Sequence, residues 1–325
     1  MDVVPFERRF IEPAAALLAD DHPPPADGGP ALDLAEIDVA RRLLDQSYDT
    51  GPAVAAVDDG TLLGFMAVTT THGPEQRHAR VRLHQHASAR RGKRAIYRRL
   101  YAALAGRLTA LGAFEHTVVV SAAHDDTVTA LFELGFGADQ IKGARPTSAP
   151  IETRQGGVRP READADDLED LLDLTVELQR FHAHSPILRP ALVDLRAIRD
   201  SFRSALGDER QLILVTEEHG RLTGMMQAGP DSRYLSTATI GIAVVTASAR
   251  SGGVGRALLS GVVDWAAGHG FETCGTEWTS ANLVGDAFWR GHGFAPVGRT
   301  LTRRIDARVS WAGTEFNYRY ALPEL

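Results

Sequence analysis

A cluster of glycines directly precedes a helical pattern in the second half of the chain. The stretch ARSGGVGRALL contains Gly252, Gly253 and Gly255. The first N–H groups of a helix have no partner within the helix, and together with the helix dipole they favour a bound anion. Glycine lets the backbone approach such an anion closely. The stretch therefore predicts an anion site, to which Arg250 and Arg256 can add charge-assisted hydrogen bonds.

Two known phosphate-binding motifs do not fit this stretch. A nucleotide P-loop would end in Gly-Lys followed by Ser or Thr, and the dinucleotide fingerprint requires the spacing Gly-x-Gly-x-x-Gly. Neither pattern is present here. A tight turn, in which the glycines serve backbone geometry alone, is the alternative interpretation at this point.

The glycine stretch lies within a regular succession of expected strands and helices. A short extended piece and two helical patterns are followed by the strands QLILVTEE, RLTGMMQA and ATIGIAVV, then by the helix from Gly253, the strand ETCGTEW, the helix VGDAFWRG and the final strands RTLTRRID and EFNYRYAL. The apolar, β-branched run from Ile240 to Val245 predicts a central strand that is covered on both faces. Strands with helices between them predict an α/β fold with an α+β mixed sheet.

The two halves of the chain resemble each other. LLGFMAV begins at Leu62 and its counterpart LTGMMQA begins at Leu222, so the repeat is about 160 residues long. A repeat of this length predicts a duplicated domain rather than a solenoid. The stretch GARPTSAPIETRQGG between the copies is typical of a linker. We expect a first domain over residues 1–145, a linker over 146–156 and a second domain over 157–325.

Composition excludes several classes of protein. A length of 325 residues suggests two domains, and a net charge of −7 is unlike that of a general nucleic-acid binder. The sequence has neither the apolar run of a membrane helix nor a secretory signal at its start, so we expect no membrane association and a cytoplasmic location. The single cysteine, Cys274, is expected to be a buried thiol rather than a nucleophile or a zinc ligand, and we expect no metal site.

The order of these features resembles the GNAT acyltransferase superfamily. A strand that ends at Val245 precedes RSGGVG, which has the family's Arg-x-x-Gly-x-Gly spacing. A later helix begins after Asn282, carries the aromatic Trp289 and ends before the pair Gly293-Phe294. The resemblance implies two tandem GNAT-like acyl-CoA N-acyltransferase domains, in an arrangement similar to that of the mycothiol synthase family.

The first copy departs from the family pattern at the loop. When HASARRGKRA is laid on the second copy, Ala89 stands at the position of Arg250, Gly92 at the first glycine and Arg94 at the second. Arg94 would project where a diphosphate is expected, and His124 stands at the asparagine position. We therefore expect a degenerate first domain that does not bind the cofactor productively.

The resemblance implies that the second domain uses acetyl-CoA to acetylate the primary amine of a small molecule, as a monomer or homodimer. The backbone N–H of Val245 would hold the thioester carbonyl. Alternatives are acetylation of a protein lysine or N-terminus, and a non-catalytic acyl-CoA sensor or scaffold. The implied cofactor contacts are Ala243, Val244, Val245, Arg250, Ser251, Gly252, Gly253, Val254, Gly255, Arg256, Asn282 and Trp289.

Proton transfer requires other residues. Many relatives carry a Tyr where this chain has Trp289, whose indole cannot protonate a leaving thiolate, and a Glu where it has Thr239 or Gly241. Glu277 is the nearest acidic candidate for the base, and a solvent-facing strand residue is its alternative interpretation. Other candidates near the acceptor are His182, His184, Asp231 and Tyr234.

Overall fold

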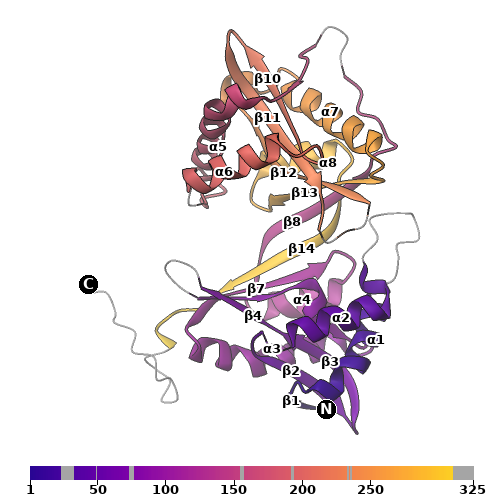
Figure 1. Ribbon diagram of the computed structural model, residues 1–325. Coiled ribbons are helices and arrows are strands. Elements are labelled where there is room, and N and C mark those ends of the chain that lie inside the picture. Colours follow the sequence, from indigo (N-terminus) through magenta and orange to yellow (C-terminus); the bar gives the residue numbers. More distant parts are fainter. Residues whose placement is uncertain are drawn as a thin grey trace. The chain divides into compact units, whose positions relative to one another are not determined.

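The computed structural model describes residues 1–22, 33–48, 50–72, 77–153, 157–191, 194–232, 234 and 236–309 (Figure 1). Its contacts divide the chain into two compact units. Of the described residues, the first unit holds those up to 141 together with 297–309, and the second unit holds those from 142 to 296. The expected boundaries at 145 and 157 imply two contiguous domains. The units are instead interleaved, because each contains a strand from the other half of the sequence.

The first unit combines two sheets with four helices. One sheet has the order β1-β2-β3-β6, and in the other β7 lies between β5 and β14, the last strand of the described residues. The strands are β1 (Asp2–Pro5), β2 (Ala53–Asp58), β3 (Thr61–Ala67), β4 (Thr69–His72), β5 (Arg77–Val81), β6 (His86–Ser88), β7 (Ala113–Ser121) and β14 (Ala295–Arg304), and the helices are α1 (Ile11–Asp21), α2 (Ile37–Ser47), α3 (Lys93–Ala110) and α4 (Asp125–Glu133).

Both faces of the first sheet are covered by helices. On one face, Ile96, Leu100 and Leu104 of α3 recur every four residues and join a buried cluster with β2, β3 and β7. On the other face, α1 and α2 pack around Phe65 of β3. The amphipathic pattern of these helices thus accounts for the layers of this unit.

The second unit is a mixed sheet with the strand order β8-β13-β12-β11-β10-β9. Its strands are β8 (Gly137–Pro146, which enters the unit at residue 142), β9 (Arg161–Glu162), β10 (Leu212–Glu218), β11 (Arg221–Pro230), β12 (Thr237–Val245) and β13 (Thr273–Thr279). Its helices are α5 (Leu168–His182), α6 (Leu195–Leu206), α7 (Val254–Gly268) and α8 (Leu283–Gly291).

The central strand expected at Ile240–Val245 is confirmed as part of β12, which lies between β11 and β13. Helices α5 and α6 pack against one face of the strands, and α7 packs against the other (Figure 1). The mixed α/β fold is therefore confirmed. The strand expected at EFNYRYAL lies outside the described residues. None of the described helices has the length and apolar character needed to cross a membrane.

Strand β8 and the segment after it are bonded to the second unit. Thr147 donates its backbone N–H to Glu272 O at 2.9 Å and its hydroxyl to Phe271 O at 2.7 Å. Trp278 of β13 lies directly on the backbone of β8, since a Cβ added at Gly143 would be 2.5 Å from its ring. The beginning of the expected linker is therefore an ordered part of this unit.

This contact predicts the effect of one methyl group. Gly143→Ala should lower the free energy of unfolding by about 1–3 kcal/mol, because Trp278 must move. Gly106→Ala is the matched control, because Gly106 lies in α3 with open space around it and should gain about 0.5–1 kcal/mol from helix propensity. Urea denaturation of both variants measures the difference. Equal stability of the two variants would show that β8 does not pack as described.

Candidate functional site

Strands β12 and β13 are paired over only part of their length. Their parallel ladder runs from Thr237↔Thr273 to Ile240↔Thr276, whereas β12 remains paired with β11 as far as Val245↔Gly224. Beyond Ile240, one edge of β12 therefore faces a gap instead of a neighbouring strand. A cavity of about 1350 Å³ includes this gap, with Ala243, Val244 and Val245 on one side and Asn282, Gly285, Phe288 and Trp289 on the other.

The open edge of β12 presents a backbone donor. Alternate residues of a strand direct their amide groups to opposite edges. Thr246 donates its N–H to Thr223 O of the β11 side at 2.9 Å, so the amide group of Val245 faces the gap. The carbonyl of Val245 accepts a hydrogen bond from Arg250 Nε at 3.2 Å. The geometry thus suits the role expected for the Val245 N–H, which stays a prediction.

The glycines of the loop serve different purposes. Gly253 is the N-cap of α7 and has φ +87°, a left-handed conformation that favours glycine. Gly255 allows α7 to approach α8, since a Cβ there would be 3.2 Å from the ring of Phe288. No side chain of the described residues caps the helix, so its first N–H groups are available to an anion.

The structure brings all the residues named as cofactor contacts to this one cavity. Residues 243–245, 250–256, Asn282 and Trp289 are among those that line it. Asn282 also caps α8, because its Oδ1 accepts a hydrogen bond from Gly285 N at 2.9 Å. Trp289 is buried in edge-to-face contact with Phe288 and Phe294, so it both packs the helix and lines the cavity.

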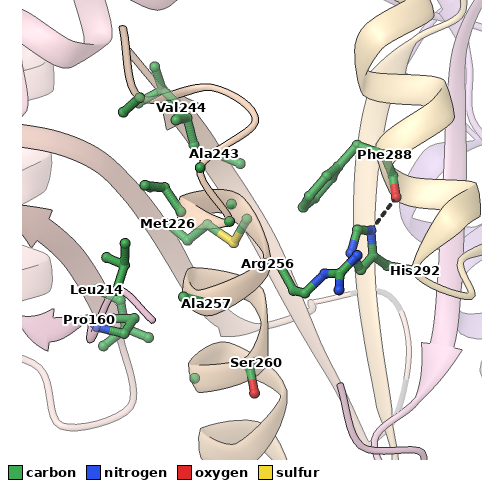
Figure 2. Close-up of a pocket in the computed structure, with 18 of the residues that line it drawn as sticks. Pro160, Leu214, Met226, Ala243, Val244, Arg256, Ala257, Ser260, Phe288 and His292 are labelled. Carbon is green, nitrogen blue, oxygen red and sulfur yellow. Dashed lines mark hydrogen bonds between the residues drawn. The ribbon is translucent and has the colours of Figure 1, made fainter. Parts of the chain in front are cut away.

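The cavity also contains aromatic residues that the sequence reasoning missed. Phe288 and His292 follow Gly285 at helical spacing on α8, and this periodicity could have identified them. His292 Nδ1 donates to Phe288 O at 2.7 Å, since a carbonyl oxygen can only accept. Figure 2 shows His292 and Arg256 pointing toward each other beside α7. Phe181 of α5 also lines the cavity, and no local sequence signal marks it.

The candidates for proton transfer lie elsewhere. Glu277 is exposed on β13 and, within the described part of the chain, is not among the residues that line the cavity. Asp231 accepts hydrogen bonds from Thr239 Oγ1 and from Lys142 Nζ, each at 2.6 Å, and its side chain is only 2% exposed. The ammonium nitrogen of Lys142 also lies 3.8 Å from the ring centre of Tyr234. These contacts place Asp231 and Tyr234 in a buried ionic cluster.

Two further groups are characterised by burial. Desolvation lowers the pKa of half-buried His182, so this ring is neutral at pH 7, while His184 is exposed. Burial raises the pKa of the Cys274 thiol to about 12. Cys274 therefore stays protonated and is not a nucleophile, as the sequence indicated.

Comparison with known proteins shows which family this site resembles. Residues 176–294 match the model of the acetyltransferase (GNAT) family. The segment that provides most of the cavity is therefore similar to the GNAT acetyltransferases. No curated protein sequence matches the chain.

The chain is also similar in fold to several solved structures. A GCN5-related N-acetyltransferase from Sphaerobacter thermophilus gives a TM-score of 0.60 at 17% identity, over 94% of this chain and 95% of that one. A tandem GNAT protein from the clavulanic acid biosynthesis pathway gives a TM-score of 0.54 at 15% identity, over 93% of this chain and 98% of that one. A GCN5-related glucosamine N-acetyltransferase region of a fungal multi-domain GH3 β-N-acetylglucosaminidase gives a TM-score of 0.57 at 12% identity, over 93% of this chain and 38% of that one. The fold is therefore a tandem pair of GNAT-like domains, as predicted.

The GNAT-like first unit has a shorter loop at the equivalent place. Residues 89–91 connect β6 to the N-cap Gly92 of α3, whereas residues 246–252 connect β12 to Gly253. The connection thus has three residues in the first unit and seven in the second. Ala89 N donates to Leu63 O at 2.7 Å, just as Thr246 N donates to Thr223 O. Ala89 thus corresponds to Thr246 rather than to Arg250, and the alignment expected from the sequence is wrong at this position because it placed no gap in the loop.

Side chains fill the region between β6 and β7 in the first unit. His86 of β6 is fully buried and donates from Nε2 to Val119 O of β7 at 2.8 Å, while its Nδ1 accepts from Tyr97 OH at 2.7 Å. The ammonium of Lys93 forms an ion pair with Asp21, and both side chains are buried. In the described part of this unit, these contacts therefore close the region that corresponds to the gap beside β12.

Two residues named from the sequence have other partners here. His124 is the N-cap of α4, as its alignment with Asn282 implied. Its ring does not cap the helix, however, because Nε2 donates to Asp21 O at 2.9 Å. The guanidinium of Arg94 forms an ion pair with Glu133 and is half exposed. Its Nε donates to the same carboxylate at 2.9 Å.

The buried His86 predicts a pH dependence of stability. Desolvation lowers its pKa from 6.5 to about 4, so the unfolded chain binds a proton that the folded chain does not. Stability is therefore present above pH 6.5 and decreases as the pH falls, by about 2 kcal/mol between pH 7 and 5. In His86→Gln this decrease should be smaller by that amount, as measured by urea denaturation at both pH values. An unchanged decrease would show that His86 is not the group responsible.

Proposed function

We propose that the second unit binds acetyl-CoA in its cavity and transfers the acetyl group to the primary amine of a small molecule. One observation carries this proposal: the uncapped start of α7 at Gly253 and the open amide edge at Val245 line the same cavity. The first feature suits a diphosphate and the second suits a thioester carbonyl, and acetyl-CoA contains both groups at the two ends of a flexible arm.

The residues of the loop would hold the diphosphate. The first amides of α7 can donate to its oxygens, because they have no partner within the helix. Arg250 on the loop and Arg256 in the first turn of α7 are exposed and supply two positive charges. The volume of about 1350 Å³ exceeds that of ordinary small-ligand pockets, which suits a long cofactor together with an acceptor.

The chemistry requires the amine nitrogen to bond to the acetyl carbon while the carbon–sulfur bond breaks. Negative charge develops on the carbonyl oxygen, and the N–H of Val245 at the open edge of β12 can donate to it. Trp289 cannot protonate the sulfur, but a thiol with pKa near 8.5 departs readily as the thiolate. The ammonium form of the amine must first lose a proton, which solvent in the open cavity can accept. The nitrogen loses a second proton as the amide forms, and this proton can go to solvent or to the departing thiolate.

The first unit would serve the fold rather than the reaction. Its loop is shorter, and His86 and Lys93 fill the region that corresponds to the gap. A small-molecule acceptor agrees with the use of this fold by the fungal protein named as a glucosamine N-acetyltransferase. That likeness concerns the fold and leaves the identity of the amine to experiment.

A charge placed at the loop tests the cofactor site. Gly253→Asp and Gly253→Asn are a matched pair, because both side chains tolerate the left-handed conformation and only one is charged. The carboxylate should weaken acetyl-CoA binding about 10- to 100-fold relative to the amide, through repulsion of the diphosphate. Isothermal titration calorimetry measures both dissociation constants. Equal constants would place the diphosphate elsewhere.

The reaction itself is tested by a panel of small amines with acetyl-CoA, following the release of free thiol. We expect turnover with at least one amine, a kcat/KM for acetyl-CoA about 10- to 100-fold lower in Gly253→Asp than in Gly253→Asn, and unchanged turnover in Arg94→Ala of the first unit. Cofactor binding without turnover would indicate a sensor, and acetylation of peptides alone would indicate a protein substrate. Either result would contradict the proposal.

A further inference from the structure

The side chain of Arg250 is held at two points. Its Nε donates to the carbonyl of Val245 at 3.2 Å, and its guanidinium carbon lies 4.6 Å from the ring centre of Phe181 on α5. Within the described residues, no hydrogen bond engages its two terminal nitrogens. Arg250 is thus a long, exposed side chain that is fixed by its inner part and has its outer N–H groups available.

Helix α5 also holds the beginning of the same loop. Glu177 Oε1 accepts a hydrogen bond from the backbone N–H of Ala247 at 3.2 Å. Glu177 and Phe181 are one helical turn apart, so both face the loop between β12 and α7. The helix itself is anchored by Leu171, Leu172 and Leu174, which are buried against the sheet. The loop therefore rests on a fixed support.

We propose that Phe181 is a positioning residue that holds Arg250 ready for the diphosphate of the cofactor. This inference rests on the proposed function. An exposed arginine loses rotamer freedom when it binds an anion, and this loss weakens binding. A guanidinium stacked on an aromatic ring and tied through Nε is already ordered, and its outer N–H groups can bind two phosphate oxygens as a fork.

The first test is a set of dissociation constants for acetyl-CoA. Phe181→Leu should weaken binding about 3- to 10-fold, which corresponds to the ordering of one long side chain, while Phe181→Tyr keeps the stacked ring and should stay within about twofold of wild type. The rate at saturating acetyl-CoA should not change, because Phe181 acts on binding alone. Phe132→Leu, at an exposed aromatic position on α4 of the first unit, is the control and should have no effect.

A double variant separates positioning from direct contact. If Phe181 acts through Arg250, Phe181→Leu should cost nothing further in an Arg250→Ala background. A full additional loss in that background would mean that Phe181 contacts the cofactor or supports the fold, and would overturn the inference. Equal dissociation constants for acetyl-CoA in wild type and Phe181→Leu would also overturn the inference, while leaving the proposed function intact. Absence of acetyl-CoA binding to wild type would overturn both.

A second measurement needs no cofactor. In protein labelled with ¹⁵N-arginine, the Nε–H resonance of Arg250, assigned by its loss in Arg250→Lys, should be displaced by the ring current of Phe181. Phe181→Leu should remove this displacement, and Phe181→Tyr should retain it. A resonance at the same position in wild type and Phe181→Leu would show that the stacking does not persist in solution, and the inference would fail.

Discussion

The site depends on the separation of two parallel strands. Because β12 and β13 stop pairing after Ile240 and Thr276, the backbone from Gly241 to Val245 has one edge that is not paired with any of the described strands. A polar edge of this kind must find water or a ligand, since an unpaired buried amide is costly. The start of α7 follows directly along the chain, so an open edge and an uncapped helix line one cavity. A loop of identical sequence beside a fully paired strand would provide only the second of these features.

The first unit shows how the same architecture loses the site. Its loop has three residues where the second unit has seven, and the ring of His86 bridges β6 and β7. A buried ion pair between Lys93 and Asp21 lies at the start of α3. Desolvation keeps His86 neutral near pH 7, so the bridge carries no charge. The two units thus keep the fold while their equivalent gaps are used in opposite ways, one open and one filled by side chains.

The exchange of strands makes the halves of the sequence depend on each other. The ladder from Gly298 to Arg304 completes the sheet beside β7, and Trp278 packs on the glycine backbone of β8. A side chain at Gly143 would prevent this packing, so the exchange is fixed by a specific close approach. Each unit therefore depends on a segment that the other half of the sequence supplies.

The sequence by itself determined the mixed α/β fold, the duplication and the position of the glycine loop, because periodicity, repeats and helix starts are local signals. The spacing from Arg250 to Gly255 and the later pair Asn282 and Trp289 were sufficient to indicate which residues share a cavity. Only the tertiary structure decided that Phe181 stacks on Arg250, that Ala89 corresponds to Thr246, and that each unit takes a strand from the other half. These features depend on contacts between residues far apart in the chain, and packing between distant elements leaves no periodic pattern in the sequence.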